Sequence, residues 1–275
     1  MEMNELLVAI RAALEAGAAI MEVYTDPNAD FEIERKADNS PLTIADKRSN
    51  EVITRRLSAL PYPVLSEEGK QRPYAERKGW HTYWVVDPLD GTKEFIKRNG
   101  EFTVNIAFVR DGKPEGGVIY VPVTRELYFS TMEEGAFKAE SITALAPDED
   151  YAALVRRSTH LPIKEAAQRD AYVVVASRSH LNAETERFIE TVKQKYPKVE
   201  KVSKGSSLKL CLIAEGKADV YPRYAPTMEW DTAAGHAIVR AAGGEVYQAG
   251  TTVPLTYNKE NLLNPSFIVY PHGSE

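Results

Sequence analysis

The sequence predicts an α+β protein in which helices and sheets pack as layers. In the first half, β-rich segments follow one another around an Asp111-Gly112 turn, a pattern typical of antiparallel hairpins. In the second half, β-rich and helical segments alternate. The chain has 275 residues and is 43% apolar, which suffices for a sizeable core. Elements that each bury one face must pack against one another, so a layered fold follows.

The elements of the first half are predicted from apolar periodicity and from proline positions. Helices are expected over residues 2–23 and 43–60, the second one limited by Pro41 and stopped by Pro61. The expected strands cover residues 64–65, 83–86, 101–110, 117–123 and 127–129, with a polar loop over residues 70–79.

A mixed, charged stretch over residues 141–170 is interpreted as the join between two halves. We therefore expect halves of residues 1–145 and 146–275. The expected strands of the second half are 172–176, 218–221 and 267–270, and the expected helices are 183–194, 206–215 and 231–242. Glycines follow the last two helices, as they often follow helix ends.

Composition excludes several classes of protein. The net charge is −6, so a broad basic face for nucleic acid is not expected. The chain has one cysteine, Cys211, which rules out an internal disulfide and a thiolate zinc cluster. Its N-terminus is acidic and it has no long apolar stretch, so neither a signal peptide nor a transmembrane segment is predicted. We expect a cytoplasmic protein, and peripheral association with the inner membrane is compatible with this expectation.

The stretch Asp87-Pro88-Leu89-Asp90-Gly91-Thr92 is the most informative in the sequence. A buried strand ends on one carboxylate and a second follows three positions later. Two carboxylates this close repel each other unless a positive charge lies between them. Mg²⁺ prefers such oxygen ligands, whereas an isolated motif of this kind is more often a solvated turn.

Three other acidic positions lie at expected element ends. Glu67-Glu68 follows a short strand, and the alternative is a surface acidic loop. Asp231 opens a helix, where capping and metal binding are compatible. Asp46 follows Thr43 by three residues, so a capping box is as good an explanation as catalysis. Spacing alone does not prove that these positions converge.

Together these motifs resemble the inositol monophosphatase superfamily of Mg²⁺-dependent, lithium-sensitive phosphatases. The resemblance rests on Glu67-Glu68, on the Asp87 to Thr92 stretch and on Trp230-Asp231-Thr232-Ala233-Ala234-Gly235, in that order. The finer resemblance is to 3'(2'),5'-bisphosphate nucleotidases of the CysQ type. It is carried by residues 36–41, 90–95, 99–105, 177–180 and 205–209. The resemblance implies an α-β-α-β-α sandwich.

The resemblance also implies roles for individual residues. It implies metal ligands at Glu67, Asp87, Asp90 and Asp231 and at the Leu89 carbonyl, holding two or three Mg²⁺ ions. It implies catalytic roles for Asp46, Glu67 and Thr92, with Asp46 and Thr92 orienting or activating water. Substrate contacts are expected at Asp90, Gly91, Thr92, His180, Ser206, Lys209, Arg223 and Asp231. Most ligands would then lie in the first half, with the nucleotide contacts and the last ligand in the second.

Residue chemistry gives partial support for the nucleotide contacts. Ser206 is expected to begin a helix, where free N–H groups favour phosphate, and Lys209 and Arg223 could hold a second phosphate. Each contact has an alternative explanation. Ser206 could be a helix cap and Lys209 a solvated lysine. Arg223 could belong to a surface ion pair, and His180 could be a loop histidine without a ligand.

The function that the resemblance implies is hydrolysis of adenosine 3',5'-bisphosphate to AMP and phosphate, with a role in sulfur metabolism. A phosphatase for inositol or another sugar phosphate is the nearest alternative. A catalytically silent protein that binds nucleotide or metal is a second one, although such a protein would not need a water-activating pair. A 3' exonuclease is disfavoured by the net charge and by the lack of a stripe of stacking aromatic residues.

Overall fold

The computed structural model describes residues 1–275 except 29, 32, 37–40, 71, 178–181 and 272–275. Its helices are α1 (Met3–Thr25), α2 (Ile44–Leu57), α3 (Tyr74–Arg77), α4 (Thr92–Ile96), α5 (Tyr151–Arg156), the 3-10 helix η1 (Lys164–Ala167), α6 (Ala183–Lys195), α7 (Leu208–Ala214) and α8 (Glu229–Ala241). Its strands are β1 (Glu34–Arg35), β2 (Pro41–Leu42), β3 (Val64–Ser66), β4 (Thr82–Asp90), β5 (Thr103–Arg110), β6 (Lys113–Val121), β7 (Glu126–Thr131), β8 (Gly135–Ala139), β9 (Thr159–Leu161), β10 (Tyr172–Ser177), β11 (Val199–Lys204), β12 (Tyr221–Arg223), β13 (Glu245–Gln248) and β14 (Phe267–Tyr270).

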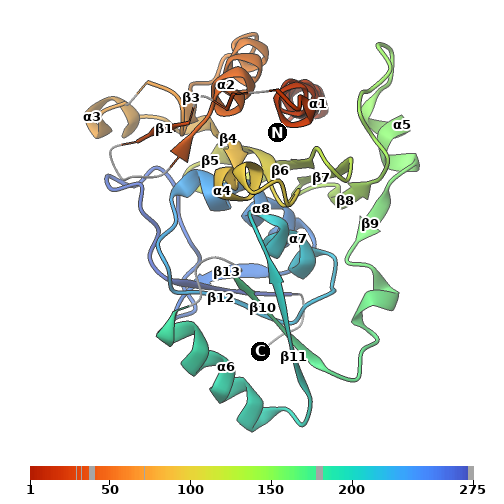
Figure 1. The fold of residues 1–275 in the computed structure, drawn as a ribbon, viewed down its shortest axis with the longest axis vertical. Helices are drawn as coiled ribbons and strands as arrows, with labels where there is room; N and C mark the ends of the chain where they lie inside the picture. The colour runs from red at the N-terminus through yellow and green to blue at the C-terminus, as the bar shows by residue number, and fades with distance from the viewer. Residues whose placement is uncertain (29, 32, 37–40, 71, 178–181, 272–275) are drawn as a thin grey trace.

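The larger sheet holds β3 to β9 in sequence order. Strands β3 and β4 run parallel, and the other neighbours are antiparallel. Along β4, Trp84 and Val86 face one side of the sheet while Tyr83 and Val85 face the other, because side chains alternate along a strand. The first pair packs in the core with α1 and α2, and the second pair packs in the core with α7 and α8, on opposite sides of the sheet (Figure 1).

A second β layer lies beyond α7 and α8 (Figure 1). It contains the parallel pair β10–β11 and the antiparallel group β12–β14–β13, joined by a bridge between Val174 and Val220. Val173 and Val175 point into the core shared with α7 and α8. Val174 points the opposite way and packs on Ile189 of α6. The predicted α-β-α-β-α sandwich is confirmed.

Several predicted boundaries were wrong. Within the expected loop 70–79, residues Tyr74–Arg77 form α3, and Arg77 is buried because it bonds to Asn258, far away in the sequence. Helix α2 ends at Leu57, since residues 58–60 close short backbone turns. Strand β12 begins at Tyr221, later than expected.

The helix predicted over residues 206–215 begins later, at Leu208. Ser206 lies in the preceding turn with φ +51°, so it does not begin the helix and the expected role at a helix N-terminus falls away. In contrast, α8 begins at Glu229, earlier than expected. Asp231 is therefore inside the first turn of α8, where its carboxylate accepts a hydrogen bond from the Met228 N–H at 2.8 Å.

Strands β8, β11 and β13 were not predicted. Each is short or carries charged and small residues, so its apolar pattern is weak. Strand β9, which follows the predicted join at residue 145, pairs with β8 and extends the larger sheet. The division into halves at residues 145 and 146 stays a prediction. Cys211 is buried in the core, as expected from its apolar neighbours.

Candidate active site

The stretch from Asp87 to Asp90 continues strand β4 and is not the solvated turn that an isolated motif of this kind more often forms. Asp87 pairs with Asn105 of β5, and the register then shifts before Asp90. The Pro88 carbonyl accepts a hydrogen bond from Ser49 of α2 at 2.6 Å. Asp90, after this irregularity at the end of β4, lines a pocket together with Glu67 and Asp231.

Gly91 ends this stretch and has φ +94°, a backbone conformation that other residues rarely adopt. A Cβ atom at this position would lie 3.0 Å from the Glu101 carbonyl oxygen. A side chain at this position would therefore be strained. The chain reverses here and enters α4 at Thr92, which brings the Thr92 hydroxyl back beside the strand end.

Three carboxylates converge at the strand ends. Glu67 follows β3, Asp87 lies in the parallel neighbour β4, and Asp231 comes from α8. One oxygen of each lies within 4.8 Å of one oxygen of the other two. Parallel strands end at the same edge of a sheet, which explains why Glu67 and Asp87 meet. Asp231 reaches them only because α8 packs across the sheet.

This clustering changes the acidity of the carboxylates. Burial raises the pKa of Asp87 well above its ordinary value, and the charges of Glu67, Asp90 and Asp231 raise it further. Burial also raises the pKa of Asp231 to about 8, with Asp90 and Glu67 adding to the effect. Lys36 contributes positive charge through ion pairs with Glu67, at 2.7 Å, and with Glu68.

These residues fit a hard divalent cation. All three converging donors are carboxylate oxygens, the ligands that Mg²⁺ prefers. Their mutual repulsion is relieved when a cation lies between them. The Leu89 carbonyl lies at the same strand end and accepts a long hydrogen bond, 3.4 Å, from Thr92. Its remaining lone pair can serve as a further oxygen donor.

These pKa shifts predict how stability depends on pH without metal. Asp46, Asp87 and Asp231 keep their protons in the folded state to higher pH than in the unfolded chain, with folded pKa values of about 6 for Asp46 and about 8 for Asp231. The folded state then binds more protons above pH 4, so stability falls as pH rises toward 8. We expect the melting temperature in EDTA to fall over this range, and saturating Mg²⁺ to offset the fall.

The Asp231→Asn variant is the control for this measurement, because it lacks one of the shifted carboxyl groups. Its melting temperature in EDTA should decline less steeply between pH 5 and pH 8 than that of the wild type. Equal slopes for the two proteins would contradict the assignment of Asp231 as a buried, cation-requiring carboxylate.

Asp46 and Thr92 form a hydrogen-bonded pair beside the three carboxylates. The Thr92 hydroxyl donates to Asp46 Oδ1 at 3.1 Å. Asp46 Oδ2 accepts from the Thr43 N–H at 2.8 Å and the Thr43 hydroxyl at 2.5 Å. The predicted capping box is confirmed, and Asp46 in addition contacts Thr92, while its catalytic role stays a prediction. Burial raises the pKa of Asp46 to about 6.

Asp90 is held differently from the other carboxylates. Its Oδ2 accepts hydrogen bonds from Ser206 and Ser207, both at 2.8 Å, and from Asn105 at 3.3 Å. Ser207 also donates to the Asp231 carbonyl oxygen at 3.2 Å. Sequence reasoning missed Ser207 and Asn105. Asn105 carried a usable signal, because it is a polar residue at a buried position of an otherwise apolar strand.

Lys209 and Arg223 lie together at a pocket of about 370 Å³, which Glu67, Asp90 and Asp231 also line. Burial lowers the pKa of Lys209 to about 8; the charge of Asp90 opposes this shift and that of Arg223 adds to it. Lys209 donates to the Ser206 carbonyl at 2.5 Å, and Arg223 donates to the carbonyl of Ala225 at 3.1 Å.

The structure thus brings most of the predicted site residues together. The pocket is lined by the predicted residues Glu67, Asp90, Gly91, Thr92, Ser206, Lys209, Arg223 and Asp231. Asp46, Asp87 and Leu89 lie directly behind them and contact Thr92 or one another. His180 lies outside the described residues. The pocket also has an apolar wall that includes Trp230 and Leu263, which the sequence did not indicate.

Comparison with known proteins decides the family. The model of the Inositol monophosphatase family matches residues 2–272. The chain belongs to the inositol monophosphatase family. Enzymes of this family are metal-dependent, generally on Mg²⁺, and the cluster of Glu67, Asp87 and Asp231 fits that requirement. In the described part of the chain, no helix has both the length and the apolar character needed to cross a bilayer.

Relatives within the family include proteins named 3'(2'),5'-bisphosphate nucleotidase CysQ. The protein of that name from Escherichia coli K12 is 46% identical over 262 residues, which cover 94% of this chain and 96% of the relative. The one from Haemophilus influenzae is 33% identical and covers 97% of this chain and 91% of its own length. The crystal structure of CysQ from Bacteroides thetaiotaomicron is 57% identical, with a TM-score of 0.92 over 99% of this chain and 98% of that one.

Proposed function

We propose that this protein hydrolyses adenosine 3',5'-bisphosphate to AMP and inorganic phosphate. The observation that carries the proposal is the pairing of two charged regions in one pocket. Glu67, Asp90 and Asp231 line one part, and Lys209 and Arg223 line another. A bisphosphate needs both: a site where one phosphate is cut and a positive region where the second is held. The names of the CysQ relatives support the same substrate.

In this proposal Glu67, Asp87, Asp90, Asp231 and the Leu89 carbonyl hold two or three Mg²⁺ ions. Bound Mg²⁺ neutralises charge on the scissile phosphate and lowers the pKa of water. The protein's own carboxylates fix the positions that the Mg²⁺ ions would occupy. Asp90 is oriented for this by the hydroxyls of Ser206 and Ser207.

Thr92 and Asp46 position the attacking water. The Thr92 hydroxyl donates a hydrogen bond to Asp46, so the lone pairs of its oxygen can accept a hydrogen bond from the attacking water. Asp46 is itself fixed by two hydrogen bonds from Thr43. The water oxygen attacks phosphorus directly and the bond from phosphorus to the 3' oxygen breaks. One proton of the water passes by way of Thr92 to Asp46 and the other stays on the phosphate. The leaving 3' oxygen takes up one proton in exchange, so the products are AMP and inorganic phosphate with no phosphoenzyme.

The direct test is phosphate release from three substrates, with and without Mg²⁺. We expect fast release from adenosine 3',5'-bisphosphate and slow release from inositol 1-phosphate and fructose 1,6-bisphosphate. EDTA should abolish all of it. Preference for inositol 1-phosphate would favour the sugar-phosphate alternative, and binding without release would favour a silent binding protein.

Thr92→Ala is expected to lower kcat about 100-fold while changing KM little. The hydroxyl acts on water rather than on bound substrate, so its loss should appear mainly in the chemical step. Thr92→Ser retains a hydroxyl and should recover most of the activity. A change confined to KM would instead make Thr92 a substrate contact.

A further inference from the structure

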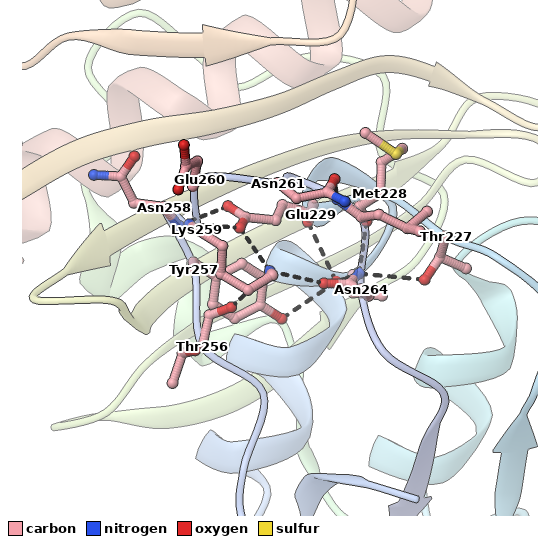
Figure 2. Close-up of polar contacts among 12 residues, drawn as sticks. Thr227, Met228, Glu229, Thr256, Tyr257, Asn258, Lys259, Glu260, Asn261 and Asn264 are labelled. Carbon is pink, nitrogen blue, oxygen red and sulfur yellow. Dashed lines mark hydrogen bonds and ion pairs between the residues drawn. The ribbon is translucent and has the colours of Figure 1, made fainter. Parts of the chain in front are cut away.

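The segment of residues 256–264, here called the anchoring segment, runs along the start of α8 (Figure 2). The Glu229 N–H donates to the Leu262 carbonyl at 3.0 Å, and the Asn264 N–H donates to the Thr227 carbonyl at 2.8 Å. Met228 and Leu263 form an antiparallel bridge between these two bonds. The segment thus pairs with the residues that lead into the helix carrying Asp231.

Glu229 is the buried centre of this contact, with an exposed fraction of 0%. Its carboxylate accepts the N–H groups of Asn258 at 2.7 Å and Lys259 at 3.0 Å, and the Lys259 ammonium at 2.6 Å (Figure 2). A buried carboxylate is costly unless it is hydrogen-bonded and paired with a charge, and here it is both. Both oxygens are used, which fixes the orientation of the side chain.

Asn264 secures the helix on both sides of Asp231. Its amide donates to the Met228 carbonyl at 2.8 Å and to the Thr232 hydroxyl at 3.0 Å. Lys259 links this group to Glu229, because its ammonium also lies 3.3 Å from the Asn264 Oδ1 atom (Figure 2). The residues that flank Asp231 are therefore held from outside the helix.

The other end of the anchoring segment is fastened to α3, the short helix that follows the Glu67 loop. Arg77 is buried and donates to the Asn258 side chain at 2.7 Å, while the Asn258 amide donates back to the Arg77 carbonyl at 2.7 Å. Arg77 also donates to the carbonyl oxygens of Lys259 and Glu260. A continuous set of polar contacts thus connects the element after Glu67 to the helix that carries Asp231.

We propose that Glu229 is a positioning residue that sets the place of Asp231 relative to Glu67 and thereby sets the affinity of the site for Mg²⁺. The inference rests on the metal site of the proposed function. Carboxylates held this close repel one another before a cation binds. Without the bonds of Glu229, the start of α8 can shift outward and relieve that repulsion, so cation binding must restore the geometry at a cost in affinity.

The test is Mn²⁺ binding to the whole protein, measured by electron paramagnetic resonance as a substitute for Mg²⁺. Glu229→Gln keeps the volume but places an amide where two N–H groups and an ammonium need acceptors. We expect its Mn²⁺ affinity to fall roughly 10- to 100-fold, the range seen when partners of metal ligands are removed. The Mg²⁺ concentration for half-maximal activity should rise in parallel, while kcat at saturating Mg²⁺ stays close to that of the wild type.

The matched control is Glu215→Gln, which also alters a buried carboxylate. Glu215 has an exposed fraction of 2% and accepts a hydrogen bond from Tyr128 at 2.5 Å, away from the carboxylate cluster. It should lose stability but keep the wild-type Mn²⁺ affinity. Lys259→Met, at a more exposed position, removes the ammonium with its charge and its hydrogen bonds but keeps the backbone N–H groups of residues 258 and 259 that bond Glu229. It should weaken Mn²⁺ binding by a smaller factor, even if Glu229→Gln folds poorly.

Wild-type Mn²⁺ affinity in both Glu229→Gln and Lys259→Met would overturn the positioning role while leaving the proposed function standing. An equal loss of affinity in Glu215→Gln would also overturn it, since the effect would then be one of stability alone. If the wild type and Asp231→Asn bind Mn²⁺ equally, the proposed metal site itself fails, and the inference fails with it.

Discussion

Asp87→Asn should lower kcat/KM for adenosine 3',5'-bisphosphate by more than about a hundredfold, the upper range for residues that only support a metal ligand. Asp87 is buried and its oxygen lies within 4.8 Å of oxygens of Glu67 and Asp231, so the change removes a central charge from the proposed Mg²⁺ site. The asparagine keeps the shape and can still accept the Leu89 N–H that now bonds Asp87. Steady-state kinetics over a range of Mg²⁺ concentrations measure the effect.

The same substitution should stabilise the protein in EDTA at pH 8. Burial and the neighbouring carboxylates raise the pKa of Asp87, so ionised Asp87 disfavours the folded state above the pKa of the unfolded chain. Asparagine carries no charge and so avoids this destabilisation, and the melting temperature should rise by a few degrees. A lower melting temperature would attribute the loss of activity to folding, and near-normal turnover at saturating Mg²⁺ would remove Asp87 from the ligand set.

Arg223→Ala should lower kcat/KM for adenosine 3',5'-bisphosphate roughly 10- to 100-fold, as expected for lost hydrogen bonds to a charged group. It should scarcely affect inositol 1-phosphate. Arg223 lies with Lys209 at the pocket, where it can face a second phosphate that only the nucleotide carries. It donates to the backbone carbonyls of Ala225 and Pro226, and among the described residues no acid lies within ion-pair distance of it. The ratio between the two substrates is the quantity to measure.

Arg240→Ala is the matched control for this ratio. Arg240 is also partly buried and donates to a backbone carbonyl, that of Pro114, but it is not among the residues that line the pocket. Its substitution should leave the substrate ratio unchanged. Equal losses on both substrates in Arg223→Ala would refute the role in holding a second phosphate and would support the sugar-phosphate alternative.

Much of the fold could be predicted because local pattern and core packing agree. The helix around Leu6 and Ile10 and the strand around Val85 bury the faces that their periodicity indicates. The misplaced boundaries lie where distant contacts decide the structure. In the otherwise exposed segment around α3, Arg77 is buried, and its partner, Asn258, lies on another part of the chain. Local pattern carries no signal for such a contact.

The features of the candidate site also fall into those set by residues close in sequence and those set by contacts between distant residues. The sequence by itself determined the chemistry: the carboxylates of Glu67 and Asp87 at strand ends, the glycine at position 91 and the Thr43–Asp46 capping box, since each depends on residues close in the chain. Only the tertiary structure decided that Asp231 meets them, that Asp46 bonds Thr92, and that Ser207 holds Asp90. These contacts join residues far apart in sequence, and their geometry is set by how α2, α7 and α8 pack on the larger sheet, which no local spacing encodes.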